Sequence, residues 1–360
     1  MLDVLRSAVA FIVEIGVLIF IHELGHYFAA RSQHVTVETF SVGFGPALLK
    51  YKSKKSGTVW QISALPLGGY VKMQGWGETR ASGPAQPGSF ATASLASKAM
   101  IVAAGPLANL ILAVVLYAGL FMSAGRVVTQ PVFDQIEPGS PAALSHLQAG
   151  DRVLAIGDAS IGNFSQMQRI VMANPNRELD FTIARAGKDM VLPVSIGEVN
   201  LDGDQIGHLG VVGTQSTLKR LAPGAAIIAS FQETGAQITG WVAGIKMLVL
   251  KQQGLRDLAG PIGIAEITGK VAALGIAPVI TLIALLSINL GLVNLIPIPL
   301  LDGGHLLFYL VEFIIGRPVP EQMREFGLRL GVGLLLSLML LVTFDDLARL
   351  GLFSWFTKLL

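Results

Sequence analysis

Four stretches of this sequence are long and apolar enough to cross a lipid bilayer as helices: residues 5–29, 100–122, 276–296 and 326–344. The hydrocarbon core of a bilayer needs about 20 mostly apolar residues per helix. Hydrophobic residues make up 52% of the chain and charged residues 14%, whereas about a quarter of the residues in a soluble domain are charged. The sequence therefore predicts a polytopic α-helical membrane protein with about four transmembrane helices, and excludes an ordinary soluble enzyme.

The basic residues near these stretches predict an orientation, because lysine and arginine are enriched in cytoplasmic loops. Segment 31–98 carries eight basic residues against two acidic ones, and only Arg6 precedes it. The first stretch is too long for a signal peptide and has no small-residue cleavage site, so we expect it to remain as an anchor. We expect 31–98 to be cytoplasmic, the N-terminus to lie outside, and segment 124–275 to lie outside as well.

The outer segment changes character along its length. Residues 127–213 alternate short β-branched runs with Gly/Pro/Asp turns, which is typical of a small β-rich domain. The runs 138–143 and 149–156 resemble the start of a PDZ domain of the bacterial protease type, with 165–172 as the helix beside its groove; the alternative is a generic β-rich domain. PDZ domains bind peptide ends by strand addition. For 216–275 we expect an interfacial amphipathic segment, while 225–250 is also long enough to dip into or cross the membrane.

Composition limits the chemistry. The chain has no cysteine, which excludes disulfides and thiolate ligands, so a metal would be held by histidine and carboxylate groups. A net charge of +2 gives no reason to expect a nucleic-acid partner.

The sequence His22-Glu23-Leu24-Gly25-His26 places an H-E-x-x-H pattern inside the first apolar stretch. Residues four apart share one face of a helix, so His22 and His26 can bind one metal ion with Glu23 beside them. Zinc suits this ligand set, and the glutamate would act as general base and then acid in peptide hydrolysis. Ionisable groups inside a membrane span are costly unless they have a function.

A catalytic zinc site has a third protein ligand and an open position. The first and third spans run in the same direction, so their C-terminal ends meet at the same membrane face. The run 294–305 follows the third span and contains two candidates at that depth, Asp302 and His305. Position alone leaves both open.

These features together resemble the site-2 protease family of intramembrane zinc metalloproteases, most closely its bacterial regulator of sigma-E type. The resemblance rests on H-E-x-x-H in the first span, N-x-x-P-x-P-x-L-D-G-G-H in 294–305, the PDZ-like insert, and the runs 41–46, 65–73 and 105–109. It implies one zinc ion per chain, Glu23 as the catalytic residue, and Asp302 as the third ligand beside His22 and His26. His305 is then a nearby structural residue, and Asn294 holds substrate backbone or the developing oxyanion.

The resemblance also implies a membrane-associated β-hairpin region whose edge pairs with an extended substrate. Gly43, Gly45, Gly68 and Gly69 are the substrate-binding candidates there, although ordinary turn chemistry also explains these glycines. The run 105–109 reads equally well as close helix packing or as part of the functional site. The insert has room for a single PDZ domain, whereas many relatives of this type carry two.

The implied protein is a multi-pass protease of the bacterial inner membrane with a periplasmic PDZ-like domain. Its partners would be the lipid bilayer and a pre-trimmed single-span protein, such as an anti-sigma factor, whose transmembrane segment it cuts in regulated intramembrane proteolysis. The alternatives are a non-proteolytic scaffold with a peptide-binding PDZ domain and a membrane di-iron oxidase. The predicted segments are 1–30 (helix 1), 31–98 (β-loop region), 99–123 (helix 2), 124–215 (PDZ-like domain), 216–275 (interfacial segment), 276–304 (helix 3 with the LDG motif), 305–325 (cytoplasmic loop), 326–345 (helix 4) and 346–360 (tail).

Overall fold

The computed structural model describes residues 2–76, 87–201, 204–250 and 260–349. The chain divides into two compact units, a helical unit made of Met1–Leu120 and Pro223–Leu360 and an inserted unit, Phe121–Ala222. The predicted tail, 346–360, lies outside the described residues from position 350 onward. Each unit is described below by itself.

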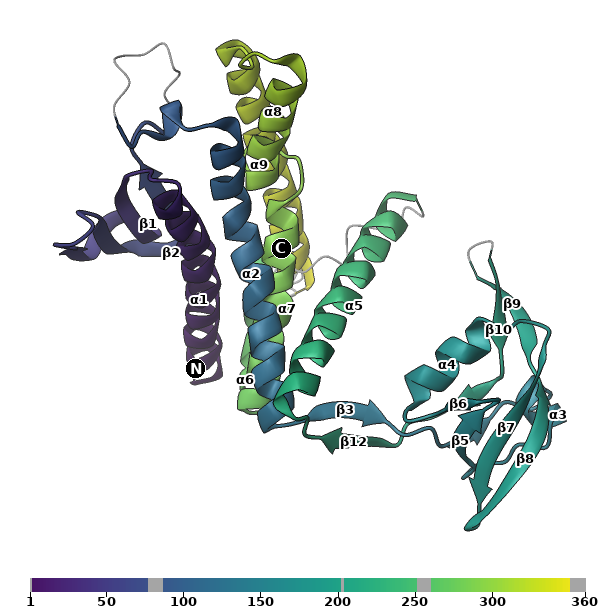
Figure 1. The fold of residues 1–360 in the computed structure, drawn as a ribbon. Coiled ribbons are helices and arrows are strands. Elements are labelled where there is room, and N and C mark those ends of the chain that lie inside the picture. Colours follow the sequence, from purple (N-terminus) through teal and green to yellow (C-terminus); the bar gives the residue numbers. More distant parts are fainter. Residues whose placement is uncertain (1, 77–86, 202–203, 251–259, 350–360) are drawn as a thin grey trace, which may run out of the picture. The chain divides into compact units, whose positions relative to one another are not determined.

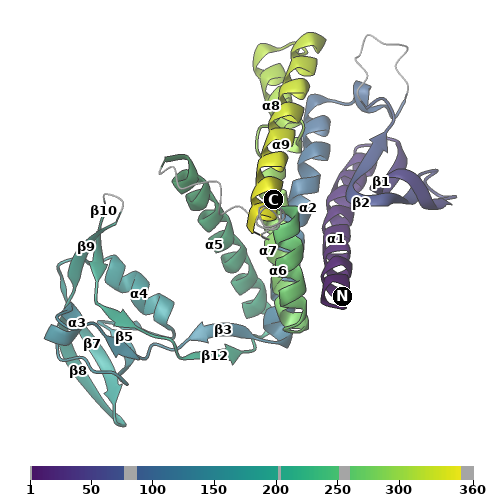
Figure 2. The same ribbon diagram turned by 180° about the vertical axis from the view of Figure 1, so that it is seen from behind.

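Four long apolar helices dominate the helical unit. They are α1 (Leu2–Ser32), α2 (Leu95–Ser123), α7 (Ile276–Asn294) and α9 (Glu321–Arg349). These are the four helices in the described part of the chain that are long and apolar enough to span a membrane. Helices α2, α7 and α9 run alongside one another in both views (Figure 1, Figure 2). The predicted fold class, a polytopic helical membrane protein with a β-rich insert, is confirmed.

The third span ends earlier than the sequence predicted. Helix α7 stops at Asn294, and a new helix, α8 (Asp302–Ile315), begins where we expected the end of helix 3 and a cytoplasmic loop. Pro297 and Pro299 stand between the two helices. Because proline lacks the N–H that a helix interior needs, these two residues separate α7 from α8. Helix α8 then closes on Gly316 in the left-handed conformation, with φ of 71°.

Two long strands, β1 (Val37–Lys52) and β2 (Val59–Met73), form an antiparallel sheet beside α1 (Figure 1). The first half of β1 pairs on both sides, with 59–62 on one side and 69–73 on the other. The second half of β1 folds back and pairs with 59–63. Segment 69–73 is therefore an edge of the sheet. A short 3-10 helix, η1 (Phe90–Thr92), leads into α2.

A buried cluster joins the sheet to the helices at the C-terminal end of α1. It contains residues from α1, β1, β2, α2 and α8: Ala30, Val35, Val37, Met73, Phe90, Ile101, Val102 and Tyr309. Burial of these side chains holds the end of α1, the start of α2 and the start of α8 together. This is the part of the fold in which the predicted metal ligands lie.

Helices α5 (Pro223–Leu250) and α6 (Pro261–Ala272) occupy most of the segment predicted to be interfacial. Helix α6 is tied to α1 by the Thr268 hydroxyl, which donates to Oε2 of Glu14 at 2.8 Å. The Asp346 carboxylate of α9 accepts from the backbone N–H groups of Gly260 and Gly263 at the other end of α6. Glu14, an acidic residue in the first apolar stretch, thus contacts a threonine of α6.

The inserted unit is a β-rich fold with its own core. Its central sheet has the strand order β6-β5-β7-β8, and α4 packs on the same core through Met167 and Val171. Phe133 and Phe181 are fully buried in that core. The elements are β3 (Arg126–Thr129), β4 (Gln135–Ile136), α3 (Pro141–Leu144), β5 (Arg152–Ile156), β6 (Ala159–Ser160), α4 (Phe164–Met172), β7 (Glu178–Arg185), β8 (Lys188–Ser195), β9 (Gly197–Leu201), β10 (Asp204–His208), β11 (Val211–Val212) and β12 (Ser216–Lys219).

The two ends of the insert pair with each other. Strand β12 lies antiparallel to β3 with Ser216 opposite Thr129, so the compact unit includes residues that we assigned to the next segment. Within the unit, Arg185 donates from Nε and Nη2 to both carboxylate oxygens of Asp151, at 2.7 and 2.6 Å. The Asp151 side chain is fully buried. This bidentate pair, whose hydrogen bonds raise the pKa of Arg185, fixes the turn before β5 to β7.

Candidate metal centre and its cavity

Helix α1 presents His22, Glu23 and His26 toward one buried region. Each of the three residues has less than a tenth of its surface exposed. The four-residue spacing places both histidines on one face of the helix, and their rings meet edge to face with centroids 4.9 Å apart. The structure thus brings the three residues of the H-E-x-x-H pattern into one buried region.

Asp302 completes a triangle of ligand atoms with the two histidines. Its Oδ2 lies 3.1 Å from Nε2 of His22 and 3.5 Å from Nε2 of His26, and the two Nε2 atoms are 3.3 Å apart. These three residues form a cluster that could hold a metal ion. Asp302 opens α8, where the N-terminal end of the helix dipole favours a carboxylate.

The triangle fits zinc. Zinc–nitrogen and zinc–oxygen bonds of about 2.0–2.2 Å in a tetrahedral site separate neighbouring ligand atoms by about 3.3–3.6 Å. The three observed distances of 3.1, 3.3 and 3.5 Å lie within or just below that range. In addition, Oδ2 of Asp302 is buried and has no partner with hydrogen-bond geometry among the described residues. An acceptor atom placed this way is suited to a cation between the three groups.

Two glycines allow α8 to begin where it does. A Cβ atom on Gly303 would stand 2.3 Å from the carbonyl oxygen of Leu295, and one on Gly304 would stand 2.2 Å from that of Ile298. Any side chain at either position would push the first turn of α8 away from the linker. The L-D-G-G pattern therefore couples a ligand to the close packing that positions it.

Helix α2 supplies the surroundings of both histidine rings. Nδ1 of His26 lies 2.9 Å from the main-chain oxygen of Ile101, and Nδ1 of His22 lies 3.2 Å from Nδ2 of Asn109. A Cβ on Gly105 would stand 2.3 Å from Nε2 of His26. Gly25 permits the close approach from the other side, because its Cβ would stand 2.2 Å from the oxygen of Ala104. The Gly-Pro-x-x-Asn run thus lies against the metal cluster.

A cavity of about 560 Å³ opens beside the cluster and contains most of the predicted site residues. His22, Glu23, His26, Gly68, Gly69, Asn294 and Asp302 all line it. Gly43 and Gly45 are not among its lining residues, although Phe44 between them is. Both glycines have φ near +90°, a conformation that itself favours glycine.

The edge of the sheet runs directly past the catalytic candidate. A Cβ on Gly69 would stand 3.0 Å from Cγ of Glu23 and 2.7 Å from Cγ2 of Ile19. Gly68 has φ of 107° and would place a Cβ 2.4 Å from the ring of Phe44. Gly69 therefore lets the backbone of β2 lie against α1, while Gly68 makes room for Phe44 of β1. The edge residues Tyr70, Val71 and Met73 line the same cavity.

His305 lies near the ligands without joining them. It lines the cavity and packs edge to face on Trp76, with ring centroids 5.6 Å apart. Burial lowers the pKa of His305 below the ordinary value, which favours a neutral imidazole. The cluster of ligand atoms consists of His22, His26 and Asp302, so geometry favours Asp302 over His305 as the third ligand.

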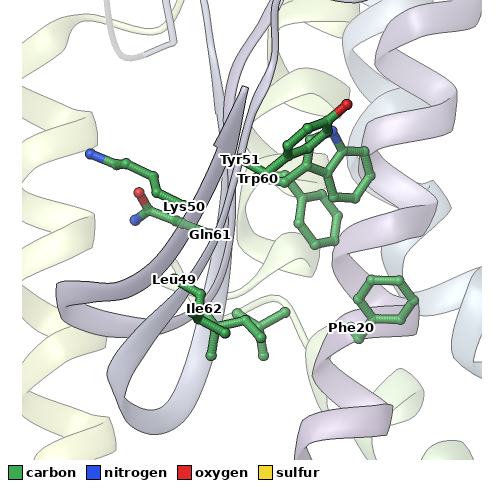
Figure 3. A pocket seen from close by; sticks show the side chains of 9 residues that line it. Phe20, Leu49, Lys50, Tyr51, Trp60, Gln61 and Ile62 are labelled. Carbon is green, nitrogen blue, oxygen red and sulfur yellow. The ribbon is translucent and has the colours of Figure 1, made fainter. Parts of the chain in front are cut away.

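A second cavity, of about 510 Å³, lies between α1 and the other side of the sheet. Figure 3 shows Phe20 facing Leu49, Trp60 and Ile62 across it, while Lys50 and Gln61 point the other way. Its lining contains no histidine or carboxylate. The candidate metal ligands and the candidate general base, Glu23, therefore line the first cavity and not the second.

Sequence reasoning missed several residues of the site. The Ile101 carbonyl, Gly25 and Trp76 contribute through contacts between segments far apart in the chain, and no periodicity signals such contacts. Pro106 leaves the carbonyl of Val102 without its usual helical donor, so it signals an irregular turn of α2 next to Ile101 but does not single out the Ile101 carbonyl.

The chain is also similar in sequence to a known family and to named proteins. The profile of peptidase family M50 matches residues 10–338. A protein of Agrobacterium fabrum, named as a candidate zinc metalloprotease, is 37% identical over 95% of this chain and 96% of its own length. Zinc metalloprotease RasP of Geobacillus kaustophilus is 30% identical over 97% of this chain and 99% of its own length.

Among solved structures, the PDZ domain of an SdrC-like protein from Listeria monocytogenes matches 23% of this chain and 84% of its own length. The sequence identity is 13% and the TM-score 0.21.

Proposed function

Because the chain belongs to peptidase family M50 and is a zinc metalloprotease, we propose that it cuts a peptide bond inside the membrane-spanning segment of a single-span protein. The observation that carries this proposal is the triangle of His22, His26 and Asp302 ligand atoms, with both histidines and Glu23 on α1, a helix of membrane-spanning character. One zinc ion per chain fits that triangle.

His22, His26 and Asp302 are the proposed zinc ligands. When bound by these residues, zinc would polarise the scissile carbonyl and lower the pKa of the attacking water. Glu23 takes the proton of that water as general base and returns it to the leaving amine as general acid. Asn294, which lines the same cavity, donates its side-chain amide to the substrate carbonyl oxygen as negative charge develops there.

The substrate is proposed to bind as an extended strand along segment 69–73. A transmembrane helix satisfies its backbone hydrogen bonds internally, so the segment must unwind before a protease can reach a peptide bond. An edge strand can replace those bonds by strand addition. Segment 69–73 is the sheet edge that lines the cavity, and Gly69 lies against Glu23, so a strand added there would pass the catalytic group.

The protein is a multi-pass membrane protein, and we place it in a bacterial inner membrane. The basic segment 31–98 supports a cytoplasmic position for the sheet and for the end of α1. The cut would then fall near the cytoplasmic leaflet and release a cytoplasmic regulator, after an earlier cut has trimmed the outer part of the substrate. The inserted unit is proposed to be periplasmic and PDZ-like, and either to bind peptide ends or to restrict access to the site.

A non-proteolytic scaffold, the alternative from another functional class, does not account for the site. A scaffold has no need of three converging metal-ligand atoms and a carboxylate in a buried region. A di-iron oxidase would need more clustered ligands than the three that the described residues bring together.

The test is Glu23→Gln, which removes the general base and leaves all three ligands. We expect purified Glu23→Gln protein to retain zinc at the wild-type level. Cells expressing it should accumulate a pre-trimmed membrane fragment that cells with the wild-type protein degrade. Persistent cleavage by Glu23→Gln would remove Glu23 from the mechanism.

Glu14→Gln is the matched control. It makes the same substitution in the same helix, at a buried carboxylate that contacts Thr268 instead of the cavity. Glutamine can still accept the threonine hydrogen bond, so we expect this variant to cleave normally. Equal losses in both variants would show that the effect arises from helix α1 in general and not from the base.

A further inference from the structure

Asn109 is a buried polar residue whose side chain reaches a proposed zinc ligand. It lies in α2 and is fully buried. Its Nδ2 is 3.2 Å from Nδ1 of His22. Its Oδ1 is buried too and has no hydrogen-bond partner among the described residues. A polar group left unsatisfied in this way costs about 1–3 kcal/mol, so its arrangement calls for a physical reason.

The role of His22 supplies that reason. Nε2 of His22 is the atom that belongs to the ligand triangle, so its lone pair must face the metal. In a neutral imidazole the proton then sits on Nδ1, which becomes a donor. An amide nitrogen cannot accept that proton, but the amide oxygen can. A half-turn of the Asn109 amide exchanges the positions of Nδ2 and Oδ1. Oδ1 then accepts the Nδ1–H of His22, so these two groups become partners.

The backbone of Asn109 is held in place by α7. The Ser287 hydroxyl of α7 donates to the main-chain oxygen of Asn109 at 2.8 Å, and Ser287 is fully buried. Gly291, one turn further along α7, brings that helix close, because a Cβ there would stand 3.5 Å from Cβ of Asn109. Helix α7 therefore packs directly on the turn that carries the amide.

The second histidine offers a comparison within the same site. Nδ1 of His26 lies 2.9 Å from the main-chain oxygen of Ile101, one of the strong acceptors that α2 offers. That contact fixes the proton of His26 on Nδ1 and leaves Nε2 for the metal. Asn109 stands two turns further along α2 and occupies the equivalent place at His22. Both imidazoles thus receive their outer partner from one helix.

We propose that Asn109 is a positioning residue that accepts the Nδ1–H of His22 through Oδ1, and so fixes the tautomer and ring orientation of this ligand. The inference rests on the zinc site of the proposed function. Outer partners of metal-binding histidines orient the ring and raise its basicity, and their loss typically weakens metal binding about 10- to 100-fold. The alternative is that Asn109 only stabilises the packing of neighbouring helices, as polar residues in membrane spans do.

Two substitutions of similar shape separate these roles. Asn109→Leu keeps the branched shape with the same number of heavy atoms and removes donor and acceptor, whereas Asn109→Asp keeps an acceptor and removes the donor. We expect the zinc affinity of the purified full-length protein, measured by competition with a chelator, to fall about 10- to 100-fold in Asn109→Leu and to remain at or above the wild-type value in Asn109→Asp. In the cobalt-loaded protein, the visible absorption bands should shift for Leu and stay as in the wild type for Asp.

Wild-type affinity in Asn109→Leu would overturn the inference in favour of packing. Equal losses in both variants would overturn it in favour of a donor role. His22→Ala distinguishes this failure from a failure of the proposed function. If His22→Ala binds zinc as the wild type does, the metal site itself is misplaced; if it loses zinc while Asn109→Leu does not, only the positioning role is wrong.

Discussion

At the scale of single residues, the third ligand is the most informative position in the site. Sequence position left Asp302 and His305 open, and the resemblance to a family favoured Asp302. In the structure, Oδ2 of Asp302 forms the triangle with both Nε2 atoms, while His305 packs against Trp76. Asp302 and His305 are three positions apart in helix α8, which is nearly a full turn, so both side chains face the same cavity.

Asp302→Asn should therefore lower bound zinc, because a neutral amide oxygen is a poorer ligand than a carboxylate. The loss of affinity should exceed the about 10- to 100-fold that removal of an outer partner costs. Metal analysis of purified protein measures it. His305→Asn is the matched control, with the same new side chain in the same helix, and should keep its zinc. A zinc-free His305→Asn together with a zinc-loaded Asp302→Asn would reverse the assignment.

At the scale of elements, helix α2 packs against the two histidine rings of the metal site. Gly105 lets the rings of His22 and His26 approach the helix, since a Cβ there would stand 2.3 Å from Nε2 of His26. The ring cannot simply swing aside, because Nδ1 of His26 contacts the Ile101 carbonyl.

Gly105→Ala should accordingly displace His26 and abolish zinc binding, with the loss of metal measured on purified protein. Gly119→Ala tests the same change in the same helix at a place where, apart from the neighbouring backbone of α2 itself, no described heavy atom lies within 4 Å of the new methyl group. It should keep its zinc and leave thermal stability unchanged or raise it by up to about 1 kcal/mol, because alanine is the better helix former. A Gly105→Ala protein with full zinc content would contradict the packing described here.

Much of the element inventory could be predicted from sequence, because it depends on local pattern. The four spans follow from apolar length, and the placement of His22 and His26 on one face follows from helical period. Helix α8 was missed because its apolar part, 306–315, is too short for a membrane span and follows the Pro- and Gly-containing run 296–304. The contacts of Asn109 and Ile101 with the histidines join residues 87 and 75 positions apart. Such contacts arise from the packing of separate helices, which single-sequence periodicity does not encode.

At the scale of the whole molecule, the proposed orientation makes a prediction that labelling can check. The chain has no cysteine, so a single introduced cysteine carries the only thiol. Lys54→Cys lies in the exposed turn between β1 and β2, and Asp158→Cys in the exposed turn between β5 and β6. A membrane-impermeant maleimide should label Asp158→Cys on intact inner membranes and label Lys54→Cys only after lysis. The opposite pattern would invert the proposed topology.

The central claim is that the zinc-loaded protein cuts a peptide bond within a membrane-spanning segment. The most direct measurement is mass spectrometry of the products formed when purified protein acts on a defined single-span substrate in detergent or vesicles. We predict a cut inside the apolar segment by the wild-type protein and none by Glu23→Gln. A cut confined to the soluble part of the substrate, or the same cut by Glu23→Gln, would contradict the account.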